Sequence, residues 1–146
     1  MNKLTLRKDN RRIKSLDEVI AFEKEAGITF PQNLREFIVA YEGSQLKERY
    51  FRRGDILHEI HQVLYLRESD LGGASVEAIL KGHRYYKEEG FVPFGVDSGG
   101  WDYNVSIKPE TYGQIWVDQF DNGEDNPWEF VCNRLEELVD GLSEEE

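Results

Sequence analysis

Cysteine and long apolar runs are both scarce in this sequence. Cys132 is the single cysteine among 146 residues, so the chain cannot close an internal disulfide, which is typical of proteins from reducing compartments. No segment approaches the roughly 20 apolar residues that a membrane-spanning helix needs. The basic start of the chain is not followed by an apolar stretch, so we expect no signal peptide. We predict a cytoplasmic protein that makes no contact with a membrane.

The signatures of common catalytic and cofactor sites are also missing. The sequence has no phosphate-binding G-x-x-x-x-G-K-[ST] loop, no G-x-S-x-G elbow and no H-E-x-x-H motif. His58 and His61 form an H-x-x-H pair that could bind a metal on a helix, but their surroundings favour a strand, and His83 is the only other histidine. Residues 118–125 do not have the ligand spacing of a calcium-binding EF-hand. We therefore predict no catalytic residues, no metal site and no cofactor.

Charge of one sign dominates, and its distribution is uneven. The net charge is −11. Residues 1–14 contain six basic groups and one acidic group, whereas residues 109–146 contain twelve acidic groups and one arginine. Such a surface repels nucleic acid, which needs Lys and Arg to neutralise phosphates. It would attract a basic protein, although acidic residues also serve solubility alone.

Helix signals are strongest near the N-terminus. Ser15 and Glu18 form a capping box, and Gly27 is placed to end the helix that follows. Pro31 fits the first turn of a second helix, which Gly43 ends. The apolar face of this second helix is formed by Leu34, Phe37, Ile38 and Tyr41.

Further along the chain, strand signals alternate with helix signals. We predict strands at 50–51, 62–66, 91–95, 103–107 and 115–117, and a helix at 75–88. Residues 97–100 are typical of a tight turn. The alternation at 103–107 indicates a half-buried strand. A last helix is predicted from Asn126, with its buried stripe formed by Val131, Leu135, Leu138 and Leu142 and with Cys132 as a buried, inert thiol.

Together these elements predict a single α+β domain, in which an antiparallel sheet is flanked by N-terminal helices and a C-terminal helix. The domain would occupy residues 1–146, with a basic N-terminal arm at 1–14 and an acidic tail at 143–146.

Aromatic residues within the acidic part of the chain indicate a protein-binding surface. We interpret Trp116 and Trp128 as core residues and Trp101, beside two glycines, as a candidate exposed anchor. Loops on a rigid sheet are where binding residues usually lie. The predicted partner-binding residues are Asp97, Trp101, Asp102, Glu110, Tyr112, Asp118, Asp121, Glu124 and Asp125.

Three stretches, in order, resemble the SUKH superfamily, which is named in part for a yeast regulator of cell-wall synthesis. They are residues 19–44 (VIAFEKEAGITFPQNLREFIVAYEGS), residues 91–107 (FVPFGVDSGGWDYNVSI) and residues 113–139, in which GQIWVDQFD is followed by NPWEFVCNRLEELV. The sequence departs from the family pattern at Glu42-Gly43-Ser44 and at Trp101, which interrupts a Gly-Asp turn.

The resemblance implies an α+β domain without catalytic machinery. In bacteria such proteins are similar to immunity proteins, which bind and neutralise a cognate toxin domain, often a nuclease. Because a nuclease must be basic to hold phosphates, an acidic inhibitor would complement it. We therefore predict a non-enzymatic immunity protein with a basic protein partner. The alternative is a regulatory scaffold related to cell-wall or glucan synthesis regulators.

Overall fold

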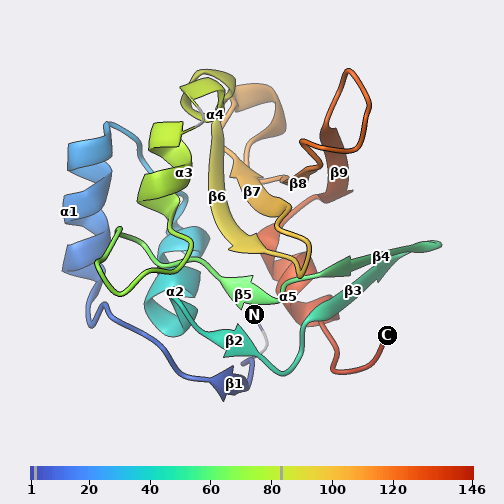
Figure 1. Ribbon diagram of the computed structural model, residues 1–146, viewed down its shortest axis with the longest axis horizontal. Helices are drawn as coiled ribbons and strands as arrows, with labels where there is room; N and C mark the ends of the chain where they lie inside the picture. The colour runs from blue at the N-terminus through green and yellow to red at the C-terminus, as the bar shows by residue number, and fades with distance from the viewer. Residues whose placement is uncertain (2, 83) are drawn as a thin grey trace.

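The computed structural model describes residues 1, 3–82 and 84–146 (Figure 1). Two helices follow the N-terminal segment, α1 (Leu16–Ala26) and α2 (Gln32–Tyr41), and both were predicted from the sequence. The Glu18 carboxylate accepts a hydrogen bond from the Ser15 N–H at 3.0 Å, as expected of a capping box. Gly27 ends α1 with a φ of 71°, a left-handed conformation that favours glycine.

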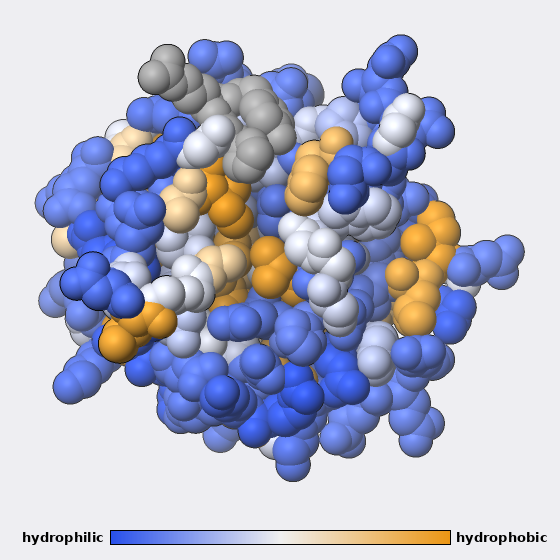
Figure 2. All heavy atoms as spheres, viewed as in Figure 1, coloured by the Kyte–Doolittle hydropathy of each residue, from blue (hydrophilic) through white to orange (hydrophobic). Residues whose placement is uncertain are grey.

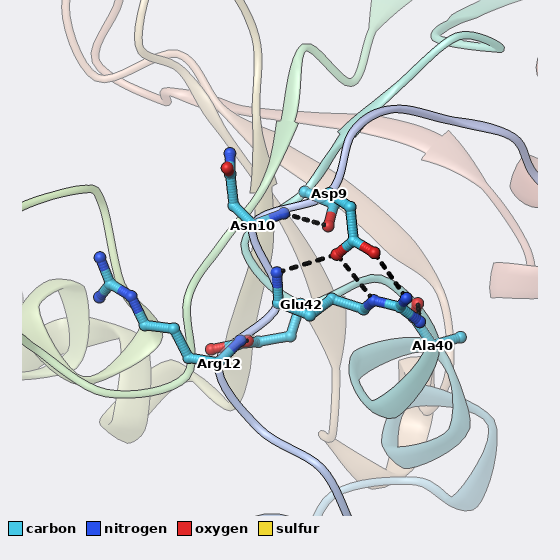
Figure 3. A network of polar contacts seen from close by, with 7 residues as sticks. Asp9, Asn10, Arg12, Ala40 and Glu42 are labelled. Atoms are coloured by element: carbon cyan, nitrogen blue, oxygen red, sulfur yellow. Dashed lines mark hydrogen bonds and ion pairs between the residues drawn. The ribbon is translucent and has the colours of Figure 1, made fainter.

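The basic N-terminal segment is fixed to the body of the protein rather than extended from it. Strand β1 (Leu6–Lys8) pairs antiparallel with β2 (Gln45–Leu46). Just beyond β1, the buried Glu42 carboxylate lies against Arg12 (Figure 3) and accepts the Arg12 N–H at 2.8 Å. The same oxygen accepts the Ile13 N–H at 3.3 Å. Its other oxygen accepts the Leu66 N–H at 3.0 Å, so one carboxylate joins three segments of chain.

A five-stranded antiparallel sheet forms the centre of the fold, with strand order β5-β6-β7-β8-β9. Its strands are β5 (Gln62–Val63), β6 (Phe91–Val96), β7 (Asp102–Ser106), β8 (Ile115–Asp118) and β9 (Trp128–Cys132). A separate hairpin of β3 (Tyr50–Arg53) and β4 (Ile56–Glu59) projects from the body of the molecule (Figure 1).

The remaining helices are short. Segments α3 (Val76–Gly82) and α4 (Arg84–Glu89) occupy the predicted helix at 75–88, and η1 (Pro109–Thr111) is a 3-10 turn between β7 and β8. The C-terminal helix is α5 (Leu135–Gly141). This arrangement confirms the predicted α+β class and its helix–sheet–helix order.

The prediction that the last helix opens at Asn126 was wrong. Asn126 does accept a hydrogen bond from the Trp128 N–H at 3.0 Å, as a cap would. The chain then continues as strand β9, which pairs with β8, and α5 begins only at Leu135. Asn side chains make the same local bond in turns as at helix caps, and the aromatic, β-branched WEFVC segment pairs with a strand that the cap motif cannot reveal.

The prediction that residues 103–107 form a half-buried strand was also wrong, because all five residues of β7 are buried. On one face, Tyr103 and Val105 belong to the hydrophobic core. On the other, Asp102 accepts a hydrogen bond from the hydroxyl of Tyr86 on α4 at 2.7 Å. Both faces of the sheet are therefore covered at β7, and the polar side chains of that face are inside the protein.

The core itself agrees with the sequence analysis. Of the eight residues on the two predicted apolar faces, six lie in one cluster of buried side chains, namely Leu34, Phe37, Ile38, Val131, Leu135 and Leu138, and Tyr41 and Leu142 are partly buried against it. Phe37 of α2 meets Phe94 of β6 edge to face, with the ring centroids 5.6 Å apart. This contact joins the N-terminal helices to the sheet.

Candidate protein-binding site

A groove lies between the β3–β4 hairpin and one end of the central sheet, and we call it the hairpin groove. It has a volume of about 520 Å³. Its lining comes from β3 and β4, the β6–β7 turn, the ends of β8 and β9, and Glu146. The residues that line it are Tyr50, Ile56, Leu57, His58, Glu59, Asp97, Ser98, Trp101, Tyr103, Gln119, Glu129 and Glu146.

His58 is the buried polar residue of the hairpin groove, with 3% of its surface exposed. Its Nδ1 lies 3.0 Å from the Tyr103 hydroxyl, and its ring meets the Tyr103 ring edge to face. Within the described part of the chain, its Nε2 has no hydrogen-bond partner. Burial, together with the nearby positive charge of Arg53, lowers the pKa of His58 to about 4, so the ring is neutral at pH 7.

Acidic side chains line the same groove as His58, and two of them are held in place by their own contacts. Glu59 accepts hydrogen bonds from the N–H and the hydroxyl of Ser98, at 3.1 and 2.5 Å, which tie β4 to the β6–β7 turn. Asp97 accepts the N–H groups of Gly99 and Trp101, both at 2.9 Å. These bonds fix the turn and hold the carboxylates in position before any partner binds.

The loop between β8 and β9 continues the acidic surface beyond the groove. Trp101 lines the groove and donates its indole N–H to Asp121 on this loop. The loop is closed by a hydrogen bond from the Gln119 N–H to the Pro127 carbonyl at 2.8 Å. Glu124 and Asp125 are exposed on it. We call the set Asp97, Asp121, Glu124 and Asp125 the acidic rim.

The structure brings together only part of the predicted partner-binding set. Asp97, Trp101 and Asp121 meet at the hairpin groove, and the loop of Asp121 also carries Glu124 and Asp125. Glu110 and Tyr112 lie in or beside η1, at the opposite end of β7. Both are exposed, Tyr112 to 57%. They do not belong to the same patch.

Asp102 and Asp118 were predicted as surface residues, and this placement was wrong. They are 4% and 0% exposed, and they are cross-strand neighbours on β7 and β8. The Tyr86 hydroxyl lies within hydrogen-bond distance of both carboxylates and shares its one hydrogen between them, and the Asn104 side chain donates to Asp102 at 2.7 Å. Burial raises the pKa of Tyr86, and the two carboxylates raise it further. The pair is an internal polar cluster under α4, so it cannot contact a partner of the folded protein.

The sequence analysis missed the contribution of the β3–β4 hairpin and of Glu129. The hairpin supplies His58 and Glu59, while Glu129 of β9 accepts a hydrogen bond from the Gln119 side chain at 2.9 Å. The Gly54-Asp55 pair at the hairpin turn was a usable signal, since such pairs mark turns between short strands.

Cationic side chains of the hairpin lie close to the groove without lining it. Arg49 Nε is 3.7 Å from Glu59 Oε2, and its guanidinium lies over the Tyr50 ring at 4.8 Å. The Arg53 guanidinium lies over the Phe130 ring at 4.9 Å. Arg49 therefore offsets part of the Glu59 charge, whereas Asp97 and Glu129 add negative charge to the lining of the groove.

The remaining residues that the sequence analysis considered for chemistry are Cys132, His61 and His83. The Cys132 thiol donates to the Arg134 carbonyl at 3.3 Å, and burial raises its pKa to about 12, which disfavours the reactive thiolate. His61 is half-buried, 3.9 Å from Glu59, whereas His83 lies outside the described residues. Among the residues described, no three His, Cys, Asp or Glu side chains are grouped to hold a metal ion.

A family model described as the SMI1 / KNR4 family (SUKH-1) matches residues 15–141. The chain belongs to this family. The SUKH-1 match includes the β3–β4 hairpin, the β6–β7 turn and the acidic β8–β9 loop, while β1 precedes it. Searches of curated proteins and of solved structures found no match. In the described part of this SUKH-1 protein, no helix has the length and apolar character needed to cross a membrane.

Proposed function

We propose that this SUKH-1 protein is a non-catalytic immunity protein of the cytoplasm. It binds a toxin domain with a basic surface, such as a nuclease, and blocks it. The observation that carries the proposal is the acidic rim, which lies on fixed turns beside a groove lined by aromatic and acidic side chains.

The charge of the rim supports a basic partner. Asp121, Glu124 and Asp125 are exposed on one loop, and the 38 residues from Pro109 to the end carry a net charge of −11. A toxin that holds nucleic acid needs Lys and Arg at its active site. A complementary acidic surface would accelerate its association and cover the residues that contact phosphates.

The rigidity of the rim supports the same proposal. Trp101 is held by two hydrogen bonds, from its backbone N–H to Asp97 and from its indole N–H to Asp121. Because the turn and the loop are already ordered, binding a partner requires little further loss of conformational entropy. Trp101 is partly buried against the core, and such aromatic side chains are common anchors of interfaces.

The contacts inside the groove favour binding over catalysis. Ser98 donates its hydroxyl to Glu59, which holds the hairpin against the sheet. His58 meets Tyr103, whose own pKa is raised by burial. These pairs join structural elements, and a protonated tyrosine is a poor base at neutral pH.

Growth rescue tests this proposal. Each reading frame that neighbours the gene is expressed alone and together with this protein in a bacterial host. We expect one product to arrest growth, co-expression to restore it, and the two proteins to copurify in a fixed ratio. The matched control replaces this protein with an unrelated acidic protein of similar size.

Two results of this experiment would count against the immunity role. If a toxic neighbour is found and co-expression does not relieve its toxicity, the immunity role is contradicted. A neighbour that binds without being toxic would instead support the alternative, a regulatory scaffold.

A further inference from the structure

We infer that the hairpin groove binds an arginine side chain of the protein partner. This inference rests on the proposed function for the source of the arginine. The chemistry of the groove itself is independent of whether the partner is a toxin.

The first argument is the buried nitrogen of His58. Its Nε2 has no hydrogen-bond partner among the described side chains and backbone, although the residue is 97% buried. A buried polar atom left without a partner is costly and uncommon in native proteins. His58 lines the groove, and in the tautomer whose Nδ1–H donates to the Tyr103 hydroxyl its Nε2 is an acceptor, which an N–H donor of a ligand would satisfy.

The second argument is charge. Glu59, Asp97, Glu129 and Glu146 line the groove, and its lining includes no Lys or Arg among the residues described. Two cations lie beside the groove: Arg49 is engaged with Glu59 and Tyr50, and Arg53 lies over the Phe130 ring. An anionic ligand is disfavoured by repulsion, and lining carboxylates such as Asp97 and Glu129 attract a cation.

The third argument distinguishes an organic cation from a metal ion. The described residues contain no metal-binding group of carboxylates and histidines, whereas the groove walls include the aromatic rings of Tyr50, Trp101 and Tyr103. A guanidinium has five N–H donors in a plane and binds both carboxylates and aromatic faces. The shape and chemistry of the lining therefore match arginine.

The fourth argument concerns the stem of that side chain. Ile56 and Leu57 are 39% and 38% exposed at the edge of the groove. Figure 2 shows hydrophobic side chains gathered over the β3–β4 hairpin, with hydrophilic residues around them. Arginine packs its methylene groups on such apolar surface while its charged end reaches polar partners.

The inference is tested with a defined probe, N-acetylarginine methylamide, added to the intact protein and followed by NMR. The matched probe is N-acetylcitrulline methylamide, which has nearly the same shape and no charge. We expect the arginine probe to shift the His58 ring and Trp101 indole signals at millimolar concentration, and the citrulline probe to leave them unchanged. Equal shifts with both probes, or shifts confined to residues outside the groove, would overturn the inference.

Two variants sharpen the test. Glu129→Gln removes one charge and keeps the shape of the side chain, and we expect it to weaken arginine binding about fivefold, the upper end for a partly exposed ion pair. Glu110→Gln makes the same charge change at the opposite end of β7 and should have no effect. Equal affinity of both variants for the probe would also overturn the inference.

Different results would contradict the immunity role and the binding of arginine in the hairpin groove. If the arginine probe binds and no toxin is neutralised, the groove chemistry stands and the immunity role falls. If a toxin is neutralised and its domain binds wild type and Glu129→Gln with the same dissociation constant, the immunity role stands and the groove inference falls.

Discussion

His58 shows what a single residue contributes to this site. It is buried between the hairpin and the sheet, with Phe51 on its own hairpin at a ring distance of 6.4 Å and Tyr103 on β7 at 5.7 Å. The residue thus joins β4 to the central sheet and lines the groove, and among the described residues its Nε2 has no hydrogen-bond partner. The H-x-x-H spacing that drew attention to it arises because His58 and His61 flank the end of β4.

The titration of His58 gives a pH prediction. Its pKa is about 4 in the folded protein and 6.5 in an unfolded chain, so between these values the unfolded state binds more protons. The contribution of His58 to the free energy of unfolding is therefore highest above pH 6.5. As the pH falls toward 4, the titration of His58 lowers that free energy by about 3 kcal/mol in total. Urea unfolding at several pH values should show a steeper loss between pH 6.5 and 4.5 for wild type than for His58→Gln. Parallel curves would contradict a neutral, buried His58.

Glu42 shows how an element is positioned by one side chain. Its two oxygens accept N–H groups from the N-terminal segment and from Leu66, and the Arg12 guanidinium lies over the Tyr65 ring at 3.7 Å. Gly43 and Gly73 lie against the same ring, where an added Cβ would come within 2.2 and 2.5 Å of it. The N-terminal segment, the end of α2 and the 65–73 segment are therefore interlocked.

Replacing Glu42 by Gln should loosen this arrangement. One of its two acceptor oxygens becomes an N–H₂ donor that faces a backbone donor, which we expect to cost about 1–3 kcal/mol of unfolding free energy. Hydrogen exchange should accelerate at the Arg12, Ile13 or Leu66 amides, while the core amides of β7 keep their relative protection. The control is Glu36→Gln on the exposed side of α2, which should leave the exchange unchanged. Unaltered exchange and stability in Glu42→Gln would contradict this account.

Local signals predicted some elements well and others poorly. Caps and apolar spacing placed α1 and α2, since these depend on residues within one or two turns. Strand β9 was predicted as a helix because the Asn126 turn makes the same local hydrogen bond as a helix cap. The pairing of β9 with β8 is not a local interaction, so the sequence around Asn126 does not indicate it. The β3–β4 hairpin was largely missed because YFRR and ILHE are short, polar strands whose partner is visible only in the fold.

At the scale of the molecule, the acidic residues form two groups. One group lies at the hairpin groove, and the other lies on the face of the sheet that α4 covers. Asp97 and Asp121 lie at the groove and could be predicted from charge and turn chemistry. Asp102 and Asp118 alternate with apolar residues on their strands, and this alternation predicts that their face of the sheet is exposed. In the structure α4 covers that face, and both residues are buried. Sequence alone located the acidic surface, but it did not separate the rim from the internal cluster.

The measurement that tests the central claim most directly is the association rate with the toxin domain identified by growth rescue. Asp121→Lys/Glu124→Lys/Asp125→Lys reverses three charges of the acidic rim. The matched control, Asp17→Lys/Glu36→Lys/Asp70→Lys, reverses three exposed charges on α1, α2 and the 67–74 segment, away from the rim (Figure 1).

We expect the rim variant to associate at least about tenfold more slowly than the control variant at low salt, because steering by complementary charge accelerates association. The difference should narrow at high salt, where exposed charges are screened beyond about 3–10 Å. Equal association rates for the two variants at low salt would contradict the claim that the partner docks on the acidic rim.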